Sequence, residues 1–154
     1  MSKVTLSGPT IFSEVIEAAT AFADRSHEDA IKHGKQKYTT LLILTDGAAS
    51  DVRDTVECIE AASDAPLSIV IVGIGAFEDW SDMKFLDNFD DEEYDIVQFV
   101  EFDKHAHSLN SLAAATLSEL PDQLVRYYQR NGIDPLPPVL VEADEIPILG
   151  PSEW

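Results

Sequence analysis

Three short apolar runs divide the chain and predict its strands. They are Tyr38 to Gly47 (YTTLLILTDG), Leu67 to Ile74 (LSIVIVGI) and Asp95 to Phe102 (DIVQFVEF). Runs of this length, rich in aliphatic residues and bounded by polar ones, are typical of strands buried on both faces of a parallel sheet covered by helices. We therefore expect an α/β fold with about three parallel strands flanked by helices.

Apolar residues at helical spacing lie between these runs. A first helix is expected from Thr10, as N-cap or close to it, to a stop at Gly34. Ser50 and Asp51 mark the start of a second helix, with acidic residues at the positive end of its dipole. The apolar positions of the two helices are Phe12, Val15, Ile16, Ala19, Phe22 and Ala23 in the first, and Val52, Val56, Ile59 and Ala62 in the second.

The second half of the chain predicts two further helices. A short one lies within residues 77–89, with Trp80, Met83 and Leu86 facing inward. A long one runs from Ser108 to Tyr128 or beyond, and Pro121 should break or kink it because proline lacks a backbone donor. Asn131 and Gly132 provide its stop.

Two segments lack apolar periodicity. Asp87 to Asp95 is nearly all acidic and predicts a solvated loop. Beyond Ile133, prolines alternate with acidic residues and scattered aliphatics, which predicts an extended, mostly disordered tail. The expected organisation is one domain over residues 1–133 and a Pro-rich acidic tail over residues 134–154.

The amino-acid composition argues against several classes of binding partner. The 154 residues carry a formal net charge of -19, which argues against nucleic acid as a partner and against attraction to anionic membrane surfaces. The single cysteine, Cys58, excludes an internal disulfide. With no signal-like start and no apolar run of about 20 residues, we expect a soluble cytoplasmic protein.

The candidate site lies where the first strand ends. In open parallel sheets, ligands bind beyond the carboxyl ends of the strands, which is where Asp46 falls. From position alone Asp46 is a ligand, a catalytic acid or a cap at a strand-to-helix turn. Thr10, at the expected start of the first helix, is interpreted as the N-cap or a residue close to it.

Other patterns favour structural roles. Gly73-Ile74-Gly75 lacks the third glycine of a dinucleotide fingerprint and predicts a tight turn. The acidic run lacks the glycine and the ligand spacing of a calcium loop. Cys58 is expected to be half-buried and unactivated. No catalytic motif is present, so we expect no enzyme activity. The four histidines never lie beside cysteine at metal spacing and are expected at the surface: His27, His33, His105 and His107.

The order of these elements resembles the second half of a von Willebrand factor A domain. The amino-acid sequence of the segments is most similar to the A domain of copines. The segments that carry the resemblance are SGPTIFSEVI, LLILTDG, TVECIEAASDAPLSIVIVGIG, DIVQFVEF and ELPDQLVRYYQRNGI. They cover most of the chain before the tail, in the family's order. Plant RING-type ubiquitin ligases carry a similar A domain.

The resemblance implies a metal-ion-dependent adhesion site built from three loops. Thr10 matches the threonine of the second loop and Asp46 the aspartate of the third. The D-x-S-x-S loop has no counterpart: Asp79-Trp80-Ser81 begins similarly but ends in Met83. Since Mg²⁺ requires near-octahedral oxygen coordination, we expect Mg²⁺ or Mn²⁺ to bind weakly or not at all at this incomplete site.

The resemblance also implies that the family's central strand and its neighbours would precede Met1. The Leu41–Thr45 strand would then lie at an unprotected edge, which favours pairing or self-association. The C2 domains, which give copines calcium-dependent phospholipid binding, have no counterpart here. Membrane contact is therefore expected only indirectly, with plasma-membrane association implied by the family alone.

Three functions remain open from sequence. The first is a non-enzymatic module that binds protein partners through the surface around Thr10 and Asp46, or through Pro135-Leu136-Pro137-Pro138 as a left-handed extended helix. The second is an A-domain fragment of a RING-type ligase, inactive alone because one cysteine cannot build the zinc sites. The third is a non-functional truncated product.

Overall fold

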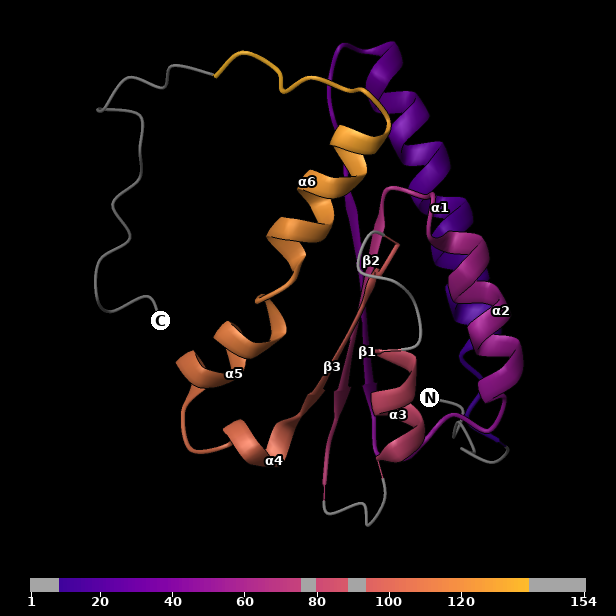
Figure 1. The fold of residues 1–154 in the computed structure, drawn as a ribbon, viewed down its shortest axis with the longest axis vertical. Coiled ribbons are helices and arrows are strands. Elements are labelled where there is room, and N and C mark those ends of the chain that lie inside the picture. The colour runs from indigo at the N-terminus through magenta and orange to yellow at the C-terminus, as the bar shows by residue number, and fades with distance from the viewer. Residues whose placement is uncertain (1–8, 76–79, 89–93, 139–154) are drawn as a thin grey trace, which may run out of the picture.

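The computed structural model describes residues 9–75, 80–88 and 94–138. Within them, three strands form one parallel sheet of order β1-β2-β3 (Figure 1). The strands are β1 (Thr39–Thr45), β2 (Leu67–Gly73) and β3 (Val97–Glu101). Leu41 pairs with Ile69, and Ile71 pairs with Phe99. The predicted α/β fold with three parallel strands is confirmed.

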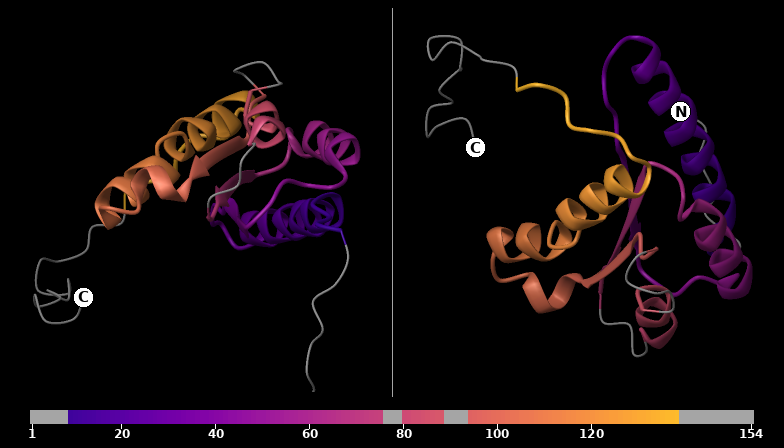
Figure 2. Two further views of the ribbon diagram at one scale, coloured as in Figure 1. Left: turned by 90° about the horizontal axis from the view of Figure 1, so that it is seen from below. Right: turned by 45° about the horizontal axis from the view of Figure 1, so that its top comes forward.

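Helices flank the sheet on both faces, as Figures 1 and 2 show. On one face lie α1 (Ser13–Lys32), α2 (Val52–Ala62) and α3 (Ser81–Leu86). The other face carries α4 (Phe102–His105), α5 (Leu109–Thr116) and α6 (Leu120–Arg130). Each strand is followed by at least one helix, so neighbouring strands run in the same direction.

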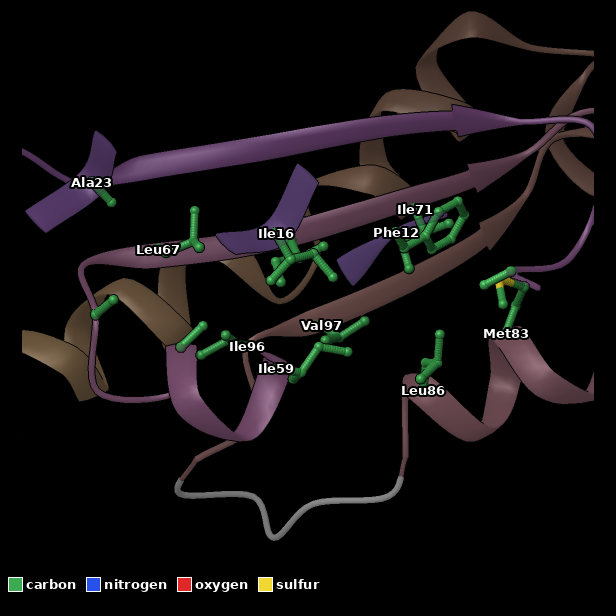
Figure 3. Packing of buried hydrophobic residues seen from close by; sticks show 14 of the residues in the cluster. Phe12, Ile16, Ala23, Ile59, Leu67, Ile71, Met83, Leu86, Ile96 and Val97 are labelled. Carbon is green, nitrogen blue, oxygen red and sulfur yellow. The ribbon is translucent and has the colours of Figure 1, made fainter. Parts of the chain in front are cut away.

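The main core lies between the sheet and α1, α2 and α3 (Figure 3). All seven residues of β2 are buried, because this strand has a neighbour on either side and helices on both faces. Ile16, Ile59, Ile71 and Met83 are fully buried in this core. A smaller cluster forms on the opposite face, where Val70, Val72 and Val100 lie beneath α5. The predicted inward positions Trp80, Met83 and Leu86 are confirmed.

The prediction that the first strand is buried on both faces is wrong. Leu41 and Ile43 pack against the main core, but Leu42 and Leu44 are 57% and 62% exposed. In the described part of the chain β1 pairs with β2 alone, and α5 stands over β2 and β3. β1 is thus an edge strand with one open face. The edge position agrees with what the family resemblance implies.

The first helix begins slightly later than expected and ends at the expected stop. α1 starts at Ser13, so Thr10 is not its N-cap, and it ends at Lys32 just before Gly34. Val15 and Phe22 are exposed. The buried stripe is Ile16, Ala23, His27 and Ala30. The expected inward positions are therefore confirmed for Ile16 and Ala23 and wrong for Val15 and Phe22.

The predicted long helix is two helices. Ser108 caps α5 as expected, since its hydroxyl accepts a hydrogen bond from the Ser111 N–H at 3.3 Å. Pro121 lies in the first turn of α6, where its missing N–H costs nothing. Asn131 follows α6 and Gly132 has a φ of 63°, which confirms the predicted stop.

The acidic loop is only partly solvated. Residues 89–93 lie outside the described residues, but Asp87 and Asp95 are half-buried. Asp87 accepts a hydrogen bond from the Phe99 N–H and Asp95 from the Val97 N–H. For these two residues the expectation of a solvated loop is wrong, because both carboxylates accept hydrogen bonds from backbone N–H groups of β3.

The first residues of the predicted tail contact the domain. The Gln36 side chain donates to the Asp134 carbonyl at 2.7 Å and accepts from the Leu136 N–H at 3.2 Å. Residues 134–138 form neither helix nor strand, and residues 139–154 lie outside the described residues. The prediction of a disordered tail over residues 134–154 therefore stays a prediction.

Candidate functional site

The loop after β1 is shaped by Thr45. Its hydroxyl donates to the Gly47 carbonyl at 2.6 Å and accepts from the Gly47 N–H at 3.3 Å. These bonds turn the chain sharply at the end of the strand and leave the Asp46 side chain exposed. Asp46 therefore lies at the carboxyl edge of the sheet, as its sequence position predicts.

Thr10 lies against the same loop. Its N–H donates to the Ser50 hydroxyl at 3.2 Å, and the Ser50 N–H donates to the Thr10 carbonyl at 2.8 Å. Thr10 is half-buried. The structure thus brings the segment before α1 to the β1–α2 loop, four residues along the chain from Asp46.

Asp51, at the start of α2, caps the start of α1, whose N-cap Phe12 lies two residues after Thr10. Its two carboxylate oxygens accept from the N–H groups of Phe12 and Ser13, at 3.1 and 3.0 Å. Burial raises the pKa of Asp51, but hydrogen bonds from the Ser13 side chain and from these backbone groups outweigh burial and lower it. Asp51 therefore stabilises the start of α1 from the start of α2, a contact that local sequence does not reveal.

These residues make a poor fit to a divalent cation. Asp46 and Thr10 offer one carboxylate and one hydroxyl, whereas Mg²⁺ or Mn²⁺ needs about six oxygen ligands. The nearby Asp51 adds none, since both its oxygens are committed to α1. Within residues 9–75, 80–88 and 94–138 no three His, Cys, Asp or Glu side chains gather as a metal site.

The described residues of the D-x-S-like segment after β2 have structural roles. Trp80 and Met83 are buried in the main core, and Ser81 begins α3; Asp79 lies outside the described residues. Gly75 has a φ of 98°, consistent with the predicted turn. Gly73 is required for a different reason, since a Cβ there would lie 2.7 Å from the Trp80 ring.

A second surface, which we name the β1–α5 groove, was not recognised from sequence. It has a volume of about 590 Å³ and contains no charged residue. Leu109 and Leu117 of α5 are 84% and 54% exposed along it. Its lining residues are Thr40, Leu42, Leu44, Val70, Val72, Ile74, Phe102, Leu109, Leu112, Ala113, Thr116 and Leu117. No sequence signal marks it, because Leu41 to Leu44 is a continuous apolar run in which the exposed and buried residues look alike.

An acidic groove of about 570 Å³ runs between α1 and α2. Glu17, Asp24, Asp54 and Glu57 line it together with Cys58. The Cys58 thiol is half-buried and lies 3.7 Å from a Glu17 carboxylate oxygen. Burial, and then the Glu17 charge, raise the pKa of this thiol. The prediction of an unactivated cysteine agrees with this environment.

Three carboxylates also influence one another near the start of β3. Burial, and then the charges of Asp87 and Asp95, raise the pKa of Glu119 to about 7. The Gln98 amide oxygen accepts from the Glu119 N–H at 3.2 Å and so holds the start of α6 beside β3. Sequence reasoning missed this cluster because Glu119 is far from the other two along the chain.

The surface assignment of the histidines is wrong for His27, which is 7% exposed. Its Nδ1 lies 2.9 Å from the Lys37 carbonyl, and its ring contacts Tyr127 edge to face. His105 Nδ1 lies 2.9 Å from the Ser111 hydroxyl, across the turn between α4 and α5. This contact joins the end of α4 to the first turn of α5.

Fold and site together define a parallel α/β domain with its candidate loops at the carboxyl edge and an open apolar groove beside an edge strand. The chain matches the copine family over residues 1–136. It is 40% identical over 157 residues to Copine-C of Dictyostelium discoideum, covering 96% of this chain and 28% of that protein. It is 39% identical over 145 residues to Protein BONZAI 1 of Arabidopsis thaliana, covering 88% of this chain and 24% of that protein.

The chain therefore belongs to the copine family. It spans about a quarter of the length of these relatives. None of its described helices is long and apolar enough to cross a membrane.

Proposed function

We propose that this copine-family chain is a non-enzymatic protein-interaction module with a von Willebrand factor A type arrangement. The observation that carries the proposal is the β1–α5 groove, where exposed leucines line an uncharged hollow beside β1, which pairs only with β2 among the described residues. Contiguous apolar surface of this kind is characteristic of protein–protein contact. The groove offers area to bury but no titratable side chain or reactive thiol, which supports binding without chemistry.

The strand-end loops are a second part of the proposal. Thr10 and Asp46 remain the residues through which a metal would act, and we propose that binding of Mg²⁺ or Mn²⁺ is weak or absent. The support is the small donor set and the commitment of Asp51 to α1. Isothermal titration calorimetry with each metal is expected to show no site of micromolar or tighter affinity. Heat from such a site, abolished by Asp46→Ala, would contradict this expectation.

We assign no phospholipid binding to these residues. The formal charge of -19 opposes approach to anionic lipid headgroups. Calcium-dependent phospholipid binding, implied for full-length copines by the resemblance, belongs in this proposal to C2 domains. A cytoplasmic location, with membrane contact only through other domains, is part of the same proposal.

Panning of a displayed library of random 12-residue peptides tests the interaction function. Peptides selected on the wild-type chain are expected to bind the Leu117→Lys variant at least about tenfold more weakly, because a charge would lie in the groove. The control is Ile31→Lys, since Ile31 is 52% exposed on α1 and outside the groove. Equal loss in both variants, or selection of peptides that ignore Leu117→Lys, would refute the groove as the binding surface.

A further inference from the structure

Residues 134–138 follow the end of α6 and extend away from the helices and the sheet, as Figures 1 and 2 show. Their sequence is Asp134-Pro135-Leu136-Pro137-Pro138. Proline fixes its own φ, and the residue before a proline is restricted to extended conformations. Each of these residues either is a proline or precedes one. The backbone of the whole segment is therefore restricted to the conformations that a left-handed polyproline helix uses.

One side-chain amide holds the start of this segment against the domain. The Gln36 Nε2 donates to the Asp134 carbonyl at 2.7 Å, and the Gln36 Oε1 accepts from the Leu136 N–H at 3.2 Å. The Leu136 N–H is the only backbone donor in residues 135–138, because proline has none. The segment therefore uses its one donor on the domain, and the backbone groups that remain in it are carbonyl acceptors.

These acceptors and the proline rings are presented to solvent. All residues from 134 to 138 are exposed, and no described residue donates a hydrogen bond to the carbonyls of residues 135–138. With three residues per turn, Pro135 and Pro138 lie on one edge of a polyproline helix. A partner that contacts this edge needs hydrogen-bond donors on flat apolar surfaces, and Trp and Tyr side chains combine the two.

The charges around the segment indicate the rim of the partner's groove. Asp134 begins the segment, and Glu142, Asp144 and Glu145 follow it in the sequence. Residues 131–154 contain no Lys or Arg. A groove with an acidic pocket that selects a basic residue beside the prolines therefore does not fit this segment. A groove with Lys or Arg at its rim has the complementary charge.

We propose that residues 134–138 are a binding segment, recognised as a left-handed polyproline helix by a protein domain whose groove is lined by Trp and Tyr and has a basic rim. The conformational restriction lowers the entropy lost on binding. Gln36 is a positioning residue, because it holds one side of the segment on the domain and leaves the edge with Pro135 and Pro138 to the partner. This inference goes beyond the proposed function, since the segment shares no residue with the β1–α5 groove.

An array of purified SH3, WW and EVH1 domains tests the segment as a ligand, with the whole chain as the probe. At least one domain with a basic rim is expected to bind the wild-type chain, and SH3 domains that select Arg are expected not to bind it. The double variant Pro135→Ala/Pro138→Ala should bind at least about tenfold more weakly, since both prolines of the recognised edge are lost. Pro147→Ala is the matched control: it removes a proline outside the segment and should leave the affinity unchanged.

The role of Gln36 is tested by comparing the chain with a peptide of residues 131–142. Because the peptide lacks Gln36, it is expected to bind the same domain about twofold to tenfold more weakly than the chain does. The Gln36→Ala chain should bind as weakly as the peptide. Amide hydrogen exchange followed by NMR gives an independent readout: the Leu136 N–H should be protected in the wild-type chain and lose this protection in Gln36→Ala. Lys35→Ala, at an exposed neighbouring position, should leave the protection unchanged.

Each part of the inference can fail. No binding by any domain of the array, or equal binding of the wild-type chain and the double proline variant, overturns the binding segment. Binding by Arg-selecting SH3 domains alone overturns the basic rim. Equal affinity of peptide and chain, with an unprotected Leu136 amide, overturns the positioning role of Gln36. Circular dichroism should show the same helix content in the double proline variant as in the wild-type chain, because residues 134–138 form neither helix nor strand.

Discussion

Asp51 joins the starts of two helices, and its contribution to stability can be measured. Asp51→Ala leaves the N–H groups of Phe12 and Ser13 without their acceptor. Loss of an N-terminal cap usually costs about 0.5–2 kcal/mol of the free energy of unfolding. Urea denaturation is expected to show a loss in this range. Asp54→Ala, at an exposed position in the first turn of α2, should cost less; equal losses would refute the cross-helix cap.

Because of Glu119, the free energy of unfolding is expected to depend on pH, and the direction of this dependence can be worked out. Its pKa is raised from 4.5 to about 7 by burial and by Asp87 and Asp95. A carboxyl that binds its proton more tightly when folded stabilises the fold below its unfolded pKa, and that stability is lost as the pH rises. The unfolding free energy should therefore fall between about pH 4.5 and pH 7.

Glu119→Gln is expected to reduce this pH slope, because the amide does not titrate and preserves the side-chain shape. Denaturant titrations at pH 5 and pH 8 compare it with Glu60→Gln, an exposed carboxyl on α2. An unchanged slope in Glu119→Gln would show that Asp87, whose pKa is also raised by burial, is responsible instead.

Single residues were the part of this structure that sequence predicted least well. Asp46, Cys58 and Ser108 lie where their local patterns place them. His27 and Asp87 do not, since the roles at these positions depend on partners distant in the chain, Lys37 and Phe99. A local pattern specifies which face a residue occupies, but not which backbone group will need its side chain.

At the scale of elements, the end of β2 depends on close contact with Trp80. A Cβ at Gly73 would lie 2.7 Å from the indole ring. Gly73→Ala is therefore expected to destabilise the protein by about 1–3 kcal/mol, as overpacked cores do, and to change the Trp80 fluorescence. Gly47→Ala is the control, because nothing lies within 4 Å of its added Cβ. A neutral Gly73→Ala would show that Trp80 shifts freely.

The elements themselves were largely predictable. The order of helices and strands follows from apolar periodicity and from breakers such as Gly34, Pro121 and Gly132. The error at β1 has a physical origin. Leu42 and Leu44 are as apolar as the buried residues of β2, and only the position of α5 over β2 and β3 leaves them open. The exposure of such a strand depends on whether a helix packs over it, and the periodicity of its sequence does not encode this.

At the scale of the whole molecule, cooperativity decides whether this chain is a functional domain or an unstable fragment. β2 is buried throughout and connects both core clusters, through Ile71 on one face and Val72 on the other. Ile71→Ala removes part of a fully buried side chain and is expected to lower the free energy of unfolding by about 2–5 kcal/mol. Leu44→Ala, at a 62% exposed position in β1, should cost less than about 0.5 kcal/mol.

If the sheet and its helices unfold as one unit, helix content and core packing must be lost together. Far-UV circular dichroism follows the six described helices, and fluorescence of Trp80 follows the core once Trp154 is replaced by Phe. Thermal melting should give one transition by both probes, moved to lower temperature by Ile71→Ala in both. Absence of a transition in the wild-type chain would contradict the interaction function, since it requires a folded β1. Two separate midpoints would instead show that the face carrying α4, α5 and α6 unfolds independently of the main core.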